Sequence, residues 1–436
     1  MFPFTKGFSA ACLGWIVVVA GEVHAQSAIP LEQARALFAR AERMCAADDG
    51  QLWGVRLSGP IMFVDPKSRA FVASQRDSSG LASEQDGVFV GTLPGDQNIA
   101  NTAFHWAGVH WTQIIWPPPD SLPAADVLMA HELFHGAQQK LGIRGGNPPN
   151  AHLDGAAART LMQLEWRALA SAIATTDSGM RRSAIGDALA FRAARRQLAA
   201  SAATDERDLE RIEGLAEYTG MTLALRTRTE RAALVGRNIG RQVEAPTFVR
   251  GFAYASGPAY GLLLDDTQQP WREKARRGED VGDLLAAAEH VRAPAADSSA
   301  VAARARRYDG PALKAGEEAR AKAKQAVIDG YRAQLVDGPT LRIPLRKMNI
   351  QFDPRNQQPL GTAGTVYPTL RVTDVWGILT VFRGALVSAD WTSVSVSAPK
   401  DGGTTGDGWL LELKPGWKLA MGMKLGSYVL TPQSRP

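Results

Sequence analysis

Two histidines one helical turn apart, with a glutamate beside the first, are the residues of this sequence whose spacing best supports chemistry. They form the segment His131-Glu132-Leu133-Phe134-His135. Residues i and i+4 of an α-helix share a face, so both imidazoles can bind one metal ion. The motif favours zinc, which lowers the pKa of a water at such a site. Glu132 can take the proton of that water and pass it to a leaving amine, so the segment predicts peptide hydrolysis.

A catalytic zinc needs a third protein ligand, and residues 136–146 contain no histidine to supply it. A later segment, Glu213-Gly214-Leu215-Ala216-Glu217-Tyr218, resembles the glutamate zincins when it is taken together with the first motif. In that family a helix after the HExxH helix carries Glu-Gly-x-Ala, and its first glutamate binds zinc. The resemblance covers these two helices and their order along the chain. It implies that the ligands of Zn²⁺ are His131, His135 and Glu213.

This chain departs from the family in one respect, because 77 residues separate His135 from Glu213. Well-known members have a much shorter gap. A long insertion is tolerable because the entropy cost of closing a loop grows slowly with its length. The alternatives to Glu213 that stay open are Glu165, which is nearer in sequence, Glu217 and His152. If Glu213 is the ligand, we expect Glu217 to orient a histidine from behind.

Peptide hydrolysis also needs a donor to the developing oxyanion. Glutamate zincins often use a Tyr or His from a helix after the glutamate helix, and the resemblance therefore points to Tyr254. Tyr260 and Tyr218 are the alternatives, and any of the three can equally be an ordinary core aromatic. His105 and His110 precede the motif in a strand-like stretch, where zincins commonly bind substrate. Their odd separation places them on opposite faces if the strand is continuous.

The pattern of apolar residues predicts an α+β fold. Residues 30–46 read as an amphipathic helix. Short β-like runs follow at 61–64, 70–73 and 88–90, and one strand is expected from Phe104 to Trp116. A helix capped at Ser121 or Asp120 then carries the HELFH motif to about Gly142. Further helices are expected at 156–174, 181–203, 205–225, 247–264, 279–291 and 310–336.

From residue 341 to 430 the sequence has short apolar runs broken by Gly, Pro, Asp and Asn, which indicates an all-β module. We therefore expect a zincin-like catalytic region followed by this module. The expected division is a signal peptide at 1–25, an N-terminal helix with the β-rich half of the catalytic region at 26–116, the helical half at 117–336, and the β module at 337–436.

The N-terminus predicts export. Lys6 precedes a short apolar run, and Val23-His24-Ala25 fits a signal-peptidase site, so we expect cleavage before Gln26 and a secreted or periplasmic protein. The run is too short for a stable membrane span. Only Cys45 remains after cleavage, so no internal disulfide can form. The net charge of +5 is spread out, with no aromatic-rich basic stripe, which argues against a nucleic-acid partner.

These observations predict a zinc metallopeptidase whose partner is a peptide or protein substrate. Two other classes remain open: a zinc hydrolase of a non-peptide amide or ester, and a non-catalytic zinc-containing binding protein. Glu132 argues against the second, because a structural zinc site does not need a free carboxylate beside the metal. The sequence does not determine the substrate, the oligomeric state or the role of the β module.

Overall fold

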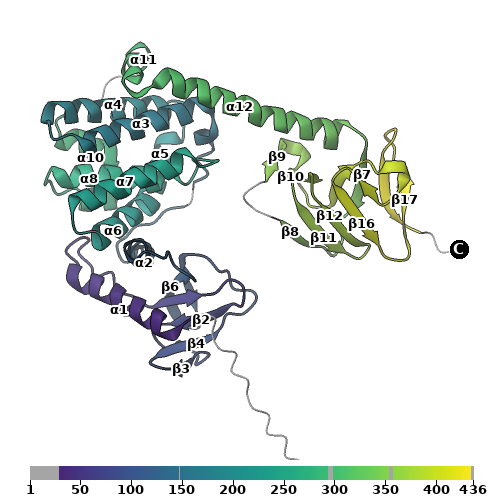
Figure 1. Cartoon of the computed structure of the whole chain (residues 1–436), viewed down its shortest axis with the longest axis horizontal. Helices are drawn as coiled ribbons and strands as arrows, with labels where there is room; N and C mark the ends of the chain where they lie inside the picture. Colours follow the sequence, from purple (N-terminus) through teal and green to yellow (C-terminus); the bar gives the residue numbers. More distant parts are fainter. Residues whose placement is uncertain (1–28, 147, 293–297, 353–356, 434–436) are drawn as a thin grey trace, which may run out of the picture. The chain divides into compact units, whose positions relative to one another are not determined.

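The computed structural model describes residues 29–146, 148–292, 298–352 and 357–433. The predicted signal peptide, residues 1–25, lies outside these ranges. The predicted α+β class is confirmed: a strand-rich N-terminal region is followed by a helical middle and an all-β C-terminal region (Figure 1). The chain divides into two compact units. Unit 1 holds the described residues up to His152 and from Glu165 to 292, and unit 2 holds Leu153–Leu164 and the described residues from Ser298 on.

The N-terminal part of unit 1 consists of one helix, α1 (Leu31–Asp48), and one mixed sheet. In the described part of this unit, six strands pair in the order β3-β4-β2-β1-β6-β5. They are β1 (Ile61–Val64), β2 (Ala70–Ala73), β3 (Ser83–Gln85), β4 (Val88–Thr92), β5 (Thr102–Trp106) and β6 (Val109–Ile115). The fully buried β1 is antiparallel to β2 and parallel to β6, so it forms the centre of the sheet.

The stretch from Phe104 to Trp116 contains two strands, and the expectation of one continuous strand is wrong. Ala107 and Gly108 have φ values of 48° and 75°, which make the two-residue turn of a hairpin. Strands β5 and β6 therefore pair antiparallel, and His105 lies directly opposite His110. Their rings lie on one face of the sheet with centroids 6.5 Å apart, so the expectation of opposite faces is also wrong.

The helical middle begins with α2 (Leu122–Ala137), which carries the HELFH motif, and α3 (Ala156–Ala174), which has the predicted bounds. Helix α2 packs between strand β6 and helix α6 (Leu215–Ala224), as Figure 1 shows. The other helices of this region are α4 (Ser178–Arg196), α5 (Ala202–Leu209), α7 (Arg228–Val243), α8 (Phe252–Asp266), α9 (Arg272–Arg277) and α10 (Val281–Ala288). None of the described helices has the length and apolar character needed to cross a membrane.

The segment expected as one helix from Asp205 to about Leu225 is nearly continuous, but it contains a π-helical turn. This turn, η2 (Glu210–Gly214), joins α5 to α6. The N–H of Leu215 donates to the carbonyl of Glu210, five residues earlier, instead of four. Such turns add one residue to a helix and are frequent at functional sites. Here the extra residue lies in the segment that carries Glu213.

Buried ion pairs tie the helices of unit 1 together. Three arginines of α4 meet four acids; the members are Arg192, Arg195, Arg196, Glu165, Glu206, Glu210 and Asp280. Arg195 Nε donates to Glu206 at 2.8 Å, and Arg192 Nη2 donates to Asp280 at 3.0 Å. Because these charges are buried, the loss of one partner would leave another uncompensated in a poorly solvated interior.

We expect unit 1 to lose stability in acid because of this cluster. Burial alone would raise the pKa values of Glu206 and Asp280, but the paired arginines hold both below their ordinary values of 4.5 and 3.8. The unfolded chain therefore binds more protons, so stability is full above about pH 5 and declines as the pH falls, on the order of 2 kcal/mol per carboxylate. Glu210 opposes this trend, since burial raises its pKa. Urea unfolding at pH 7, 5 and 3.5 measures the effect, and an unchanged free energy of unfolding at pH 3.5 would contradict it.

Unit 2 contains α11 (Ser298–Ala305), the long helix α12 (Gly310–Arg332) and two β-sheets. Within its described residues, one sheet has the order β17-β18-β7-β14-β13-β10-β9 and the other β15-β16-β12-β11-β8. The strands are β7 (Thr340–Pro344), β8 (Asn349–Phe352), β9 (Gln358–Pro359), β10 (Thr365–Tyr367), β11 (Leu370–Asp374), β12 (Gly377–Val381), β13 (Ala385–Val387), β14 (Ser393–Ser397), β15 (Thr405–Gly406), β16 (Trp409–Leu413), β17 (Trp417–Met421) and β18 (Tyr428–Pro432).

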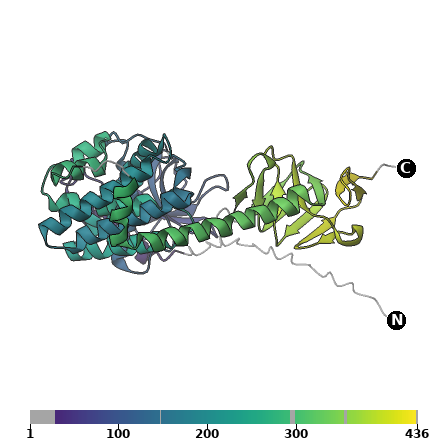
Figure 2. The same cartoon turned by 90° about the horizontal axis from the view of Figure 1, so that it is seen from above.

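Side chains from both sheets of unit 2 share one apolar core. Ile343 and Val394 come from the first sheet, and Val372 and Leu379 come from the second. Trp376, also fully buried, donates from its indole nitrogen to the carbonyl of Pro344 at 2.8 Å. Figure 2 shows these strands, in green to yellow, gathered in one body. The predicted all-β character of the C-terminal region is therefore confirmed.

Candidate metal centre

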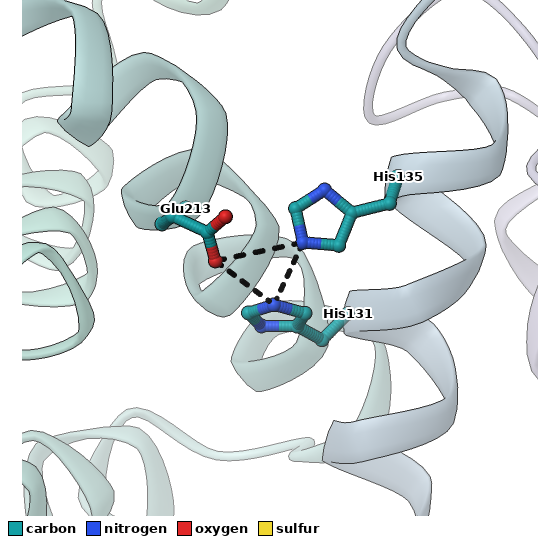
Figure 3. Close-up of side chains that lie close together, drawn as sticks. All are labelled: His131, His135 and Glu213. Atoms are coloured by element: carbon teal, nitrogen blue, oxygen red, sulfur yellow. Dashed lines mark hydrogen bonds and ion pairs between the residues drawn. The ribbon is translucent and has the colours of Figure 1, made fainter. Parts of the chain in front are cut away.

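Helix α2 places the two motif histidines on one face, as their spacing predicts. His131 is buried and His135 is half-buried. Their Nε2 atoms lie 3.0 Å apart, so the two rings converge on one point (Figure 3). Two imidazole lone pairs at this distance repel each other unless a proton or a metal ion lies between them. The pair can therefore share a proton or bind a metal ion.

Glu213 joins the two histidines from the π-helical turn η2. Its Oε2 atom lies 3.7 Å from Nε2 of His131 and 3.6 Å from Nε2 of His135 (Figure 3). Among the described residues, these three side chains form the group of potential metal ligands whose donor atoms all lie within 4.8 Å of one another. Two imidazole nitrogens and one carboxylate oxygen are a ligand set typical of catalytic zinc.

Two glycines allow the helices that carry this cluster to approach closely. A Cβ on Gly220 of α6 would lie 2.4 Å from the carbonyl oxygen of Val127 in α2. A Cβ on Gly257 of α8 would lie 2.2 Å from the Cα of Gly214, the residue after Glu213. Side chains at these positions would force the backbones apart. Gly257, three residues after Tyr254, thus allows α8 to lie close to the turn that carries Glu213.

A chain of hydrogen bonds orients His131 from behind. Its Nδ1 atom lies 2.9 Å from Oε2 of Glu217. Because a carboxylate accepts hydrogen bonds, Nδ1 donates in this contact. The lone pair of Nε2 then points toward His135 and Glu213. The other oxygen of Glu217 accepts from Nδ2 of Asn238 at 2.8 Å, and the same Nδ2 lies 3.0 Å from the carbonyl oxygen of Tyr254. Glu217 therefore occupies the orienting position expected for it.

His135 has a comparable partner that the sequence did not suggest. Nδ1 of His135 lies 3.2 Å from Oε1 of Gln138. The Nε2 amide of Gln138 donates to the carbonyl of Ile212 at 2.9 Å, next to Glu213. Gln138 therefore links the histidine helix to the turn that carries the acidic group.

Tyr254 and Arg250 both contact Glu213. The Tyr254 hydroxyl donates to Oε2 of Glu213, and Nη2 of Arg250 donates to Oε1 at 2.7 Å. The Tyr254 ring stacks on the His131 ring with centroids 5.4 Å apart and planes 10° from parallel. The phenol is thus beside the cluster, where an oxyanion donor would be needed.

The electrostatics of the cluster favour a bound cation. Burial opposes ionisation of Glu213, but the nearby imidazoles of His131 and His135 and the hydrogen bond from Tyr254 hold its pKa far below the ordinary value. Burial likewise disfavours imidazolium at His131, yet Glu213 and Glu217 raise its pKa to about 9. Without a metal ion, a proton therefore stays in the cluster at neutral pH. A divalent cation that displaced this proton would meet a ready carboxylate and two nitrogen donors.

Glu132 is the unpaired group of the site. Its side chain is buried, and its Oε2 atom has no hydrogen-bond partner within the described chain. Burial raises the pKa of this carboxyl, and the charges of Glu213 and Glu217 add to the effect. A buried polar atom without a partner is expensive unless a ligand or water satisfies it. Oε2 of Glu132 is therefore suited to bond to a water molecule or a reactant. The side chains of His131, His135 and Glu213 are suited to bind a zinc ion.

The alternative residues lie elsewhere or have other partners. Glu165 is fully buried in the ion-pair cluster, where it accepts from Arg192 at 3.2 Å and from the Tyr260 hydroxyl at 2.8 Å. His152 Nε2 lies 2.9 Å from Glu206. The Tyr218 hydroxyl donates to Asp265 at 2.8 Å. Of the candidates for a third ligand, the structure brings Glu213 to both Nε2 atoms and Glu217 only to the back of His131.

A cavity of about 270 Å³ adjoins the cluster. Tyr254 and Glu217 form the wall that it shares with the site. Val127 and Leu128 of α2 and Leu234 of α7 give it apolar sides, and Arg241 and Gln242 contribute polar groups. The cavity thus borders Tyr254 and the residues that orient His131, and its apolar walls leave space for an apolar side chain.

Sequence reasoning missed Gln138, Asn238 and Arg250. Asn238 was missed because α7 was missed, although Thr227 and Glu230 form the capping box that marks the start of this helix. That box is visible as Thr-x-x-Glu in the sequence. Gln138 and Arg250 act through tertiary contacts, and no local pattern distinguishes them from surface residues.

No protein-family model, curated protein or solved structure matches this chain. The inferred function therefore depends on the residues and geometry of the cluster.

Changing Glu217 to Gln is expected to weaken zinc binding by roughly 10–100-fold, the range typical of lost outer partners of metal ligands. The amide cannot replace the charge that orients His131, whereas Asn238→Ala keeps that charge and should cause a smaller loss. Zinc titration against a competing chelator measures both affinities. Equal affinities for zinc in the wild type and in Glu217→Gln would show that Glu217 does not help His131 to bind the metal.

Proposed function

We propose that this chain is a zinc-dependent metallopeptidase of the glutamate-zincin type. The observation that carries the proposal is the convergence of His131, His135 and Glu213, with the unpaired carboxylate of Glu132 beside them. A structural zinc site needs its ligands but not this fourth group. The combination therefore favours catalysis over metal storage or a purely structural metal.

Each residue has a separate task in this proposal. His131, His135 and Glu213 would hold a zinc ion, which would supply a Lewis acid for water and the scissile carbonyl. Glu132 accepts the proton of the attacking water on its free Oε2 and later gives it to the leaving amine. The Tyr254 hydroxyl, which donates a hydrogen bond to Glu213 in this structure, donates instead to the oxyanion during the reaction.

The substrate in this proposal is a peptide or protein. The cavity beside Tyr254 can receive one apolar side chain of a peptide, with Val127, Leu128 and Leu234 as its walls. A secreted or periplasmic location follows from the predicted signal peptide at residues 1–25. The role proposed for the C-terminal β module is contact with a substrate or a surface.

The test combines metal analysis with a substrate panel. The purified chain should contain about one zinc ion per molecule, and it should cleave peptides in a zinc-dependent manner. Cleavage confined to non-peptide amides or esters would support the alternative hydrolase. Bound zinc without hydrolysis of any panel member would support the non-catalytic binding protein.

A further inference from the structure

The three most exposed large apolar side chains in the described chain lie within five residues of unit 2. They are Met421, Met423 and Leu425, which are 74%, 108% and 93% exposed. All three lie at the turn end of the hairpin formed by β17 and β18, the hairpin tip. A cluster of such side chains on a soluble surface marks an interaction site rather than chance exposure.

This tip is held in place by the body of unit 2. At the other end of the hairpin, Trp417 and Leu419 pack against the apolar core. The N–H of Gly422 donates to the carbonyl of Ser427 at 2.7 Å, and the Ser427 hydroxyl accepts from the N–H of Thr340 at 3.1 Å. The apolar side chains at the tip are therefore presented by an ordered turn and do not belong to a frayed end.

The charge of the hairpin has one sign. Between Lys414 and Gln433 the sequence contains three exposed lysines and no Asp or Glu; the lysines are Lys414, Lys418 and Lys424. Lys424 is also tied to the body, since its Nζ donates to the carbonyl of Val336 at 3.3 Å. Lys424 lies within the tip, whereas Lys418 and Lys414 lie toward the Trp417 end of the hairpin. A basic residue among exposed apolar side chains complements anionic lipid headgroups above an acyl layer.

The shape and composition of the hairpin also suit a bilayer. Met421 and Leu425 project from a narrow turn, and a lipid interface can close around such a protrusion without a preformed groove. Tyr428, which pairs with Met421 at the tip end of the hairpin, is partly buried, and tyrosine favours the level of the headgroups. Insertion of a few apolar side chains together with basic residues gives reversible binding to a membrane surface.

We propose that the β17–β18 hairpin anchors this protein to membrane surfaces that contain anionic lipid. Met421, Met423 and Leu425 enter the headgroup–acyl boundary, and Lys424 lies at the level of the lipid phosphates. The anchor binds from one side, since no described helix is suited to cross a bilayer. The inference is independent of the peptidase proposal, because it uses residues of unit 2 alone.

Cosedimentation with vesicles tests the anchor. The chain from Gln26 onward, the predicted mature form, is mixed with vesicles of phosphatidylcholine alone or of equal parts phosphatidylcholine and phosphatidylglycerol. We expect binding to the anionic vesicles and a loss of roughly tenfold or more in the double variant Met423→Asp, Leu425→Asp. The matched control is Val327→Asp, an exposed apolar residue of α12, which should bind as wild type does.

Three outcomes would overturn the anchor. The first is wild-type binding that does not differ between the two vesicle types. The second is unchanged binding of the double variant, which would place any lipid contact elsewhere. The third is that the wild type forms a dimer in vesicle-free buffer and the double variant does not, because the tip would then contact a second copy. Unfolding curves confirm that the double variant folds, as substitutions at such exposed side chains allow.

Discussion

Replacing Glu132 with Gln is expected to leave zinc bound and to reduce peptide hydrolysis by roughly 10²–10⁴-fold, the usual contribution of a positioned general base. The amide has nearly the shape of the carboxylate but cannot accept the proton of the attacking water. The metal ligands are other side chains, so the affinity for zinc should change little. Peptide cleavage rates and zinc content by mass spectrometry measure the two properties on the same preparation.

The matched control for this variant is Glu32→Gln, which changes an exposed glutamate on α1. It should retain both full activity and zinc. Full activity in Glu132→Gln would remove the proposed general base and with it the mechanism. Loss of zinc together with activity would instead show that Glu132 supports the metal site, and the base would have to be sought among other residues.

The motif on α2 could be predicted because its geometry is local. Two histidines four residues apart share a face of any regular helix, and the surrounding apolar residues predict that helix. The position of Glu213 could be suggested only by resemblance, since 77 residues of intervening chain separate it from His135. The approach of these elements depends on close packing at Gly220 and Gly257, and no local pattern identifies the backbones that meet there.

The fold shows the same division between local and tertiary information. Hydrophobic periodicity predicted α3 and the all-β end of the chain because each segment repeats one pattern over many residues. The β5–β6 hairpin was missed because its turn begins with Ala107, a residue that rarely has a positive φ, although Gly108 follows it. The π-helical turn η2 is a one-residue irregularity in a helix, and helical periodicity cannot register it over so short a segment.

Glu165 shows why distance along the sequence was a poor guide to the third ligand. It follows the second histidine sooner than Glu213 does, which made it the first alternative. In the folded chain it is enclosed by Arg192, Arg195 and Tyr260 instead. A buried carboxylate with guanidinium partners has a structural task, since removing it would leave those cations unpaired. The two glutamates therefore differ in a way that substitution can measure.

Glu213→Gln and Glu165→Gln are expected to affect different properties. The first should lower the affinity for zinc, and the second should lower the stability of the fold. Glu213→Gln removes a direct ligand, so zinc affinity should fall by more than the roughly 100-fold that loss of an outer partner causes. Glu165→Gln should leave zinc affinity unchanged but lower the free energy of unfolding by about 3–5 kcal/mol, because a buried ion pair loses one partner. Chelator-competition titration measures the first property, and urea unfolding of the metal-free protein measures the second. A Glu213→Gln protein that binds zinc as tightly as wild type, beside a Glu165→Gln protein that does not, would exchange the two roles and end the assignment of Glu213 as ligand.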